Sequence, residues 1–168
     1  MKITILCLIL CLSLSLFNLS CNQPNSQLRA LQNQIDSLKL KTNDTYKSGL
    51  GEFMNGIQLH HGKLWFAGIN DNWKLAKFEV QEIHEALDDV KKYITDRPET
   101  KLIEMIYPPL DSVTAAIQLQ NRVLFKSSFI SLTETCNSCH RVTQHEFNVI
   151  TIPTSPPVTN QEFKPVLQ

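Results

Sequence analysis

The pattern of hydrophobic and polar positions predicts helices over most of the chain after residue 49. Apolar residues recur there at intervals of three and four, as expected for helices with one face in a core. Besides a short helical segment before Pro108, the pattern predicts four main helices, at residues 50–68, 73–94, 110–120 and 123–144. Because short connections join these helices, we expect an all-α fold with an antiparallel four-helix bundle over residues 48–147.

The second of these helices shows the clearest division into two faces. Its apolar face is predicted to contain Leu75, Phe78, Ile83, Ala86, Leu87, Val90 and Ile94. Its other face is interpreted as solvated and contains Glu79, Glu82, Glu85, Asp88, Asp89, Lys91 and Lys92. These carboxylates do not indicate a di-iron site, because that site needs Glu-x-x-His pairs and the sequence contains none.

The segments on either side of the predicted bundle have different patterns. Residues 21–47 are interpreted as a spacer, in which a heptad-like seam runs over about two heptads through Leu28, Leu31, Ile35 and Leu38. We consider two interpretations of this spacer. It is either a helix that makes a weak homodimer contact or a partly disordered linker. Residues 148–168 are rich in proline, so we expect an extended tail that lies along the bundle.

The first twenty residues are typical of an export leader. They begin with a positive charge and continue through a mostly apolar stretch that is too short and too polar for a membrane-spanning helix. We therefore interpret residues 1–20 as a signal peptide. The leader ends at "NLSC", which resembles a bacterial lipoprotein signal with Asn18 where leucine is usual. Cys21 is accordingly expected to carry lipid; the alternatives are ordinary cleavage after Ser20 and a Cys21 that is part of the leader.

Composition and cysteine count narrow the choice of ligands and partners. The 168 residues include 16 basic and 16 acidic side chains, so the net charge does not indicate a nucleic-acid partner. Of the five cysteines, Cys7 and Cys11 leave with the leader and Cys21 takes lipid. Only Cys136 and Cys139 remain in the folded part. Their two-residue gap in an exported protein fits a disulfide, a metal site or haem attachment.

The stretch "TETCNSCHRV" favours haem among these three. Cys136, Cys139 and His140 form C-x-x-C-H, the attachment signature for c-type haem. On a helix these positions share one face, so both sulfurs can bind one porphyrin while the imidazole reaches its iron. We therefore predict one covalent haem c. A local disulfide and a zinc site of Cys136, Cys139, His140 and His145 are the alternatives, although this cluster is compact for a tetrahedral ion.

With this motif near the end of its last predicted helix, the chain resembles the class II cytochromes c, the cytochrome c prime group, over about residues 48–147. The resemblance implies that Cys136 and Cys139 bind haem and that His140 is the proximal iron ligand. In that family the first helix supplies the residue on the distal side, and methionine there gives six-coordinate iron. Met54 is predicted at a similar height to His140, so it is a candidate sixth ligand; the alternative is a core methionine that leaves the iron open.

Other residues are weaker candidates for the sixth position. His61 lies seven residues beyond Met54, about 10 Å further along the helix. We expect His61 and its neighbour His60 to be polar residues at the rim of the bundle. Met105 is placed in an irregular segment, and His145 near the edge of the haem.

Four aromatic residues are expected in two places. Phe125 and Phe129 belong to the predicted haem helix, and we expect them to line its pocket. Trp65 and Trp73 flank the first predicted turn and are expected to pack together in the core.

These patterns predict an exported monohaem c-type cytochrome that transfers single electrons in the bacterial cell envelope. Its expected partners are a redox protein and, through the lipid anchor, the outer or cytoplasmic membrane on the periplasmic side. Histidine–methionine ligation raises the reduction potential, which suits electron transfer. No catalytic residue and no enzymatic activity are predicted, because no acid–base pair can be placed at the distal side. The alternatives are a five-coordinate haem protein that binds NO or CO, and a structural lipoprotein with a disulfide or zinc.

Overall fold

The structure, a computed structural model, describes residues 23–45 and 48–166. The regular elements among these residues are all helices, so the predicted all-α fold class is confirmed. The chain divides between Lys47 and Ser48 into two units. We call residues 48–166 the main unit. The predicted signal peptide and the predicted lipid-bearing Cys21 lie outside the described residues.

In the first unit the described residues form one helix, α2 (Gln23–Thr45). The residues of the predicted seam, Leu28, Leu31, Ile35 and Leu38, are all exposed. Gln32 donates a hydrogen bond of 3.1 Å to the Asp36 carboxylate one turn further on, a pairing that supports a solvated helix. Among the described residues, no helix has the length and apolar character needed to span a membrane.

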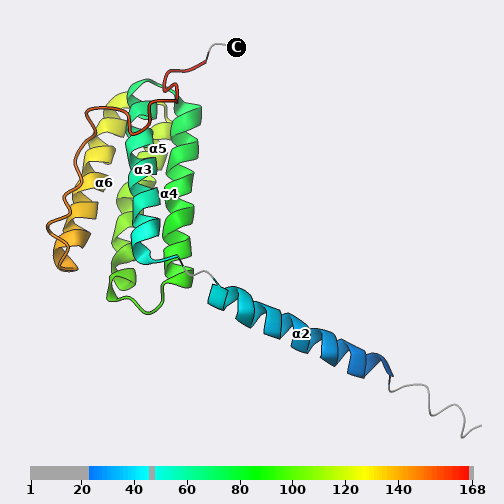
Figure 1. Cartoon of the computed structure of the whole chain (residues 1–168). Helices are drawn as coiled ribbons and strands as arrows, with labels where there is room; N and C mark the ends of the chain where they lie inside the picture. Colours follow the sequence, from blue (N-terminus) through cyan, green and yellow to red (C-terminus); the bar gives the residue numbers. More distant parts are fainter. Residues whose placement is uncertain (1–22, 46–47, 167–168) are drawn as a thin grey trace, which may run out of the picture. The chain divides into compact units, whose positions relative to one another are not determined.

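The α-helices of the main unit, α3 to α6, lie side by side (Figure 1). Consecutive helices pack against each other, and α6 packs back against α3. A 3-10 helix, η2 (Pro98–Ile106), precedes the third of them. The third begins three residues earlier than predicted, because Pro108 and Pro109 fit in its first turn, where no N–H donor is needed. The four helices are α3 (Leu50–Ile69), α4 (Trp73–Tyr93), α5 (Tyr107–Gln118) and α6 (Arg122–Val142).

Two turns of similar design join α3 to α4 and α5 to α6. Each contains a residue in the left-handed conformation, Asp71 (φ 60°) in the first and Gln120 (φ 50°) in the second. Each ends in an asparagine, Asn72 or Asn121, whose side chain accepts hydrogen bonds from backbone N–H groups in the first turn of the next helix. Arg122 donates from Nε to Asp71 Oδ1 (2.8 Å), so both turns lie at the same end of the main unit.

Aromatic side chains fill the core at this end. Phe125 and Phe129 are fully buried, with ring centroids 5.8 Å apart. Trp65 packs on Phe129 (5.0 Å), and Trp73 meets Phe125 edge-on (6.2 Å). A Cβ atom at Gly68 would lie 2.1 Å from Cζ of Phe125, so the absence of a side chain there admits the ring. We call these five residues and the space they fill the aromatic end.

The chain after α6 runs back along the helices in the direction opposite to α6 (Figure 1). It forms neither helix nor strand over residues 143–166. Pro157 packs so closely over Gly62 of α3 that a Cβ there would lie 3.1 Å from the proline ring. Phe163 is only 5% exposed and packs against Phe66 of α3 (5.7 Å between ring centroids). The tail is therefore a packed part of the main unit.

Candidate functional site

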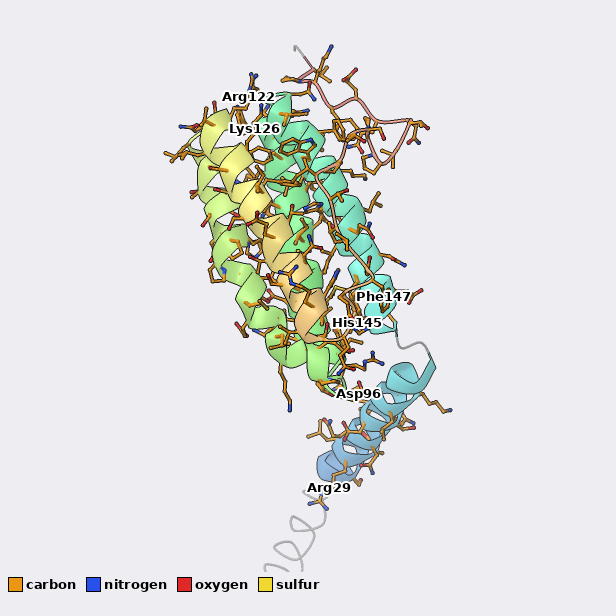
Figure 2. The ribbon with its side chains drawn as sticks, turned by 90° about the vertical axis from the view of Figure 1, so that its left-hand side faces the viewer. Arg29, Asp96, Arg122, Lys126, His145 and Phe147 are labelled. Carbon is orange, nitrogen blue, oxygen red and sulfur yellow. The ribbon has the colours of Figure 1, made fainter. Side chains whose placement is uncertain are left out.

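The opposite end of the main unit contains a cavity of about 300 Å³. Figure 2 shows His145, one of its lining residues, at the end away from Arg122. One side of the cavity is apolar and is built from α3, α4 and η2 by Leu50, Met54, Ile57, Leu87, Ile103 and Ile106. The other side is built from α6 and the first residues of the tail. We call this region the cavity end.

Five candidate ligands named in the sequence line this one cavity. They are Cys136, Cys139 and His140 from the last two turns of α6, Met54 from the second turn of α3, and His145 from the turn after α6. The motif residues meet the same cavity because positions i, i+3 and i+4 share one face of a helix. A smaller hollow of about 70 Å³ shares Met54, Cys136 and His140 with the cavity and extends to His61.

Cys136 and Cys139 are free thiols in the structure. Burial raises the pKa of Cys136 to about 12, and burial also raises the pKa of Cys139. Both side chains are therefore protonated thiols at neutral pH. The disulfide that the sequence left open as an alternative is not formed in this structure.

The imidazole of His140 has a defined orientation. Its Nδ1 lies 2.6 Å from the backbone carbonyl oxygen of Asn148. A carbonyl oxygen only accepts, so Nδ1 carries the proton and donates; in the neutral ring, Nε2 is then the nitrogen with the free lone pair. Histidines that bind metals commonly donate their other ring N–H to a carbonyl or carboxylate in this way.

Met54 lies on the apolar side of the cavity. It is half-buried and shares a face of α3 with Leu50 and Ile57, which stand four residues before it and three after it. The thioether is a soft ligand that can bind iron opposite a histidine. An unbranched apolar side chain is equally suited to fill the wall of a cavity. The position of Met54 is compatible with both roles.

Charged residues that sequence reasoning missed stand at the cavity. Arg97 and Glu99, on either side of the start of η2, form a two-pronged ion pair at 2.8 Å and 3.3 Å. The Arg97 hydrogen bond is the main reason that the pKa of Glu99 lies below its ordinary value. His145, which the sequence analysis placed near the edge of the haem, also lines the cavity and donates from Nδ1 to the Thr143 carbonyl (2.7 Å). No sequence pattern indicated that Arg97 and Glu99 lie at the cavity.

The expectation that His61 lies at a polar rim is wrong. Its side chain is 5% exposed, its Nε2 lies 2.8 Å from Thr133 Oγ1, and its ring packs on Phe129 (4.3 Å). Burial lowers the pKa of His61 to about 4. His61 is buried because the helical period places it on the core-facing side of α3, together with Ile57 and Leu64.

The predicted faces of α4 also need correction. Glu79, expected on the solvated face, is fully buried, whereas Phe78, expected in the core, is 51% exposed. The buried stripe follows Ala76, Glu79, Ile83, Leu87 and Val90, as a period of 3.6 requires. Glu79 accepts a hydrogen bond of 2.7 Å from Nδ1 of the half-buried His60. Its second oxygen, Oε1, has no hydrogen-bond partner.

Three other candidates from the sequence lie away from the cavity. Phe125 and Phe129 belong to the aromatic end and do not line the cavity, because α6 is long enough to reach both ends of the main unit. Met105 packs against the core from η2 and is not among the residues that line the cavity.

The zinc alternative can be examined in the part of the chain that the structure describes. Within residues 23–45 and 48–166, no group of three or more His, Cys, Asp or Glu side chains is arranged to hold a metal ion. Cys136, Cys139, His140 and His145 therefore do not form a ready tetrahedral site in this geometry.

Comparisons of the chain with protein-family models, curated proteins and solved structures find no match. The interpretation of the cavity end therefore depends on its residues and their geometry.

Proposed function

We propose that the protein is a monohaem c-type cytochrome that transfers single electrons, and that its main unit is an antiparallel four-helix bundle of the class II cytochrome kind. One observation carries this proposal. Cys136, Cys139 and His140 line a single, largely apolar cavity, and the hydrogen bond from Nδ1 of His140 leaves Nε2 free to bind a metal.

The residues at the cavity end fit covalent haem c. Cys136 and Cys139 would hold the porphyrin through thioether bonds, and His140 would bind the iron through Nε2. The apolar side chains of α3, α4 and η2 would exclude water from the porphyrin face. When bound, haem c supplies an iron that changes between its ferric and ferrous states by one electron.

The residue at the sixth position separates two functions. If the Met54 sulfur binds the iron, the six-coordinate site suits electron transfer at a raised reduction potential. If Met54 only forms part of the apolar wall with Leu50 and Ile57, the iron is five-coordinate and open to NO or CO. We place electron transfer first, and gas binding is the second candidate because Met54 lies on that apolar wall. A structural lipoprotein with a disulfide or zinc is the alternative without haem.

The proposed location follows from the sequence of the N-terminus. Residues 1–20 act as a signal peptide, Cys21 carries lipid, and the cytochrome domain faces the periplasm from the outer or cytoplasmic membrane. Its partner is then a redox protein of the cell envelope, and nucleic acid is not expected as a partner.

The absorption spectrum of the mature protein, made in a host that attaches haem, tests this proposal. We expect a sharp reduced α-band that CO does not change, together with a ferric near-infrared band of the methionine type. A broad reduced spectrum that shifts with CO would favour the gas-binding candidate. No haem spectrum, from a host that matures a control cytochrome, would leave the structural lipoprotein.

A further inference from the structure

The tail is attached to α6 at Ile150 by a side chain from inside the C-x-x-C-H motif. Asn137, the first variable residue of the motif, donates from Nδ2 to the carbonyl of Ile150 (2.8 Å). The Ile150 N–H donates back to Oδ1 of Asn137 (2.8 Å). One carboxamide thus pairs with both backbone groups of one tail residue, as a neighbouring strand would.

This attachment is two residues from the carbonyl that accepts the Nδ1 proton of His140. That carbonyl belongs to Asn148, whose own N–H donates to the carbonyl of His145 (2.9 Å) and so closes the turn after α6. The two residues beside Asn148 contribute little burial, since Phe147 is 80% exposed and Val149 is 65% exposed, whereas Ile150 is half-buried. The hydrogen bonds of Asn137 therefore act together with the half-buried Ile150 in placing the Asn148 carbonyl.

We propose that Asn137 is a positioning residue for His140, and that the tail is a working part of the iron site. This inference rests on the proposed function for its role in redox chemistry. The pair of hydrogen bonds from Asn137 holds residues 148–150 against α6. The Asn148 carbonyl then selects the tautomer of His140 that is protonated on Nδ1, and it fixes the ring so that Nε2 is the ligand atom.

A redox consequence follows from the strength of that hydrogen bond. A ring that donates its N–H to a carbonyl is a more basic ligand, and a more basic ligand favours the ferric over the ferrous state. If residues 148–150 move away from α6, water replaces the carbonyl and the ring turns more freely. We expect a rise in the equilibrium constant for reduction of up to about tenfold, which corresponds to about 59 mV for one electron.

The first test uses the mature chain without haem. We compare Asn137→Ala and Asn137→Asp with the wild type, and Ser138→Ala serves as the matched control. Ser138 is the other variable residue of the motif, and its hydroxyl contacts Glu134 and Arg141, not the tail. Aspartate has the same shape as asparagine, keeps the acceptor for the Ile150 N–H and lacks the donor for the Ile150 carbonyl. Asn137→Asp therefore separates the loss of a hydrogen bond from the loss of side-chain volume in Asn137→Ala.

Two measurements on these proteins report on the attachment itself. Amide hydrogen exchange at Ile150 should accelerate at least tenfold in Asn137→Ala, less in Asn137→Asp and not in Ser138→Ala. Nitrogen-15 NMR at about pH 8, above the ordinary histidine pKa of about 6.5, should show the Nδ1–H tautomer of His140 in the wild type and a mixture in Asn137→Ala. Equal exchange rates and equal tautomers in Asn137→Ala and Ser138→Ala would overturn the proposal.

The second test uses the haem-loaded proteins. The reduction potential should rise in Asn137→Ala and stay at the wild-type value in Ser138→Ala. An unchanged potential in Asn137→Ala would overturn the redox role even if residues 148–150 move away from α6. If the wild type takes up no haem in a host that matures a control cytochrome, the proposed function fails, but exchange and tautomer in the haem-free chain still decide whether Asn137 positions His140.

Discussion

The two ends of the main unit differ in how side chains fill the space between the same helices. Both α3 and α6 reach from one end to the other, so the difference lies in their side chains. At the aromatic end the fully buried Phe125 and Phe129 fill the core, and the lack of a side chain at Gly68 leaves room for the Phe125 ring. At the cavity end the same two helices present Met54 and Cys136, and a cavity of about 300 Å³ remains. The core is therefore filled at one end, whereas the other end has room for a ligand.

The largest expected effect concerns the aromatic end. Phe125→Ala should lower the free energy of unfolding of the haem-free protein by about 3–5 kcal/mol, because it opens a cavity where the ring is fully buried. Leu50→Ala at the cavity end should cost clearly less, since Leu50 is only half-buried and already faces open space. Urea unfolding of both variants measures the difference. Equal losses would contradict the contrast between the two ends.

The next effect depends on His61, which lies between the two ends. Burial lowers the pKa of His61 to about 4 from 6.5 in the unfolded chain. The unfolded state then binds a proton at higher pH than the folded state. This stability is fully present above about pH 6.5 and falls by about 3 kcal/mol as the pH drops towards 4.

Urea unfolding at a series of pH values, on the wild type and on His61→Gln, measures this contribution. The glutamine does not titrate and can still reach Thr133 by hydrogen bonding. The variant should lose stability less steeply between pH 6.5 and about 4. Parallel curves for the two proteins would show that His61 is not the group responsible.

A smaller effect compares two glycines on the same helix. Gly68→Ala should destabilise by about 1–3 kcal/mol, because its Cβ would lie 2.1 Å from the buried ring of Phe125. Gly56→Ala, nearer the cavity end of α3, should stabilise by about 0.5–1 kcal/mol, since nothing lies within 4 Å of its Cβ and alanine favours helix. Thermal unfolding of both variants should therefore give shifts of opposite sign. Shifts of the same sign would mean that the ring of Phe125 can move aside.

The smallest effect on stability is expected at Met54. Met54→Leu keeps the apolar volume and should change the free energy of unfolding by less than about 1.5 kcal/mol. In the haem-loaded protein the same change should abolish the near-infrared band of the methionine type and allow CO to bind. If the wild type already binds CO and the variant has the same spectrum, Met54 belongs only to the wall of the cavity.

The sequence predicted the helices well where the apolar period is clear. The helix predicted at residues 50–68 is observed as Leu50–Ile69, because its apolar period ends there. The residue that caps the next helix is Asn72, which the sequence analysis did not identify. On α4 the chemistry of single residues misled the interpretation. Glu79 was placed with the charged residues and Phe78 with the apolar ones, although the period puts Glu79 inside. A hydrogen bond from His60 compensates in part for the burial of Glu79, and no local sequence pattern could reveal this contact.

The candidate site was predictable as far as it depends on one helix. The motif spacing indicated that Cys136, Cys139 and His140 share a face, and the structure brings them to one cavity with Met54. The contribution of the tail could not be predicted, because His140 is held by a backbone carbonyl and every residue has one. The ion pair at the start of η2 was missed for a related reason, since that segment has no period to place it.

The position of the tail along the chain has a consequence for the order in which the site is made. A chain leaves the ribosome from its N-terminus, so the residues of α3 to α6 emerge before residues 148–150. Until then the motif is present but the carbonyl of Asn148 is not, and the face of α6 that carries Asn137 stays uncovered. A chain that stopped after residue 147 would carry every residue of C-x-x-C-H and still lack the partner of His140. Residues 148–150 therefore complete the site after the helix that carries the motif has been made.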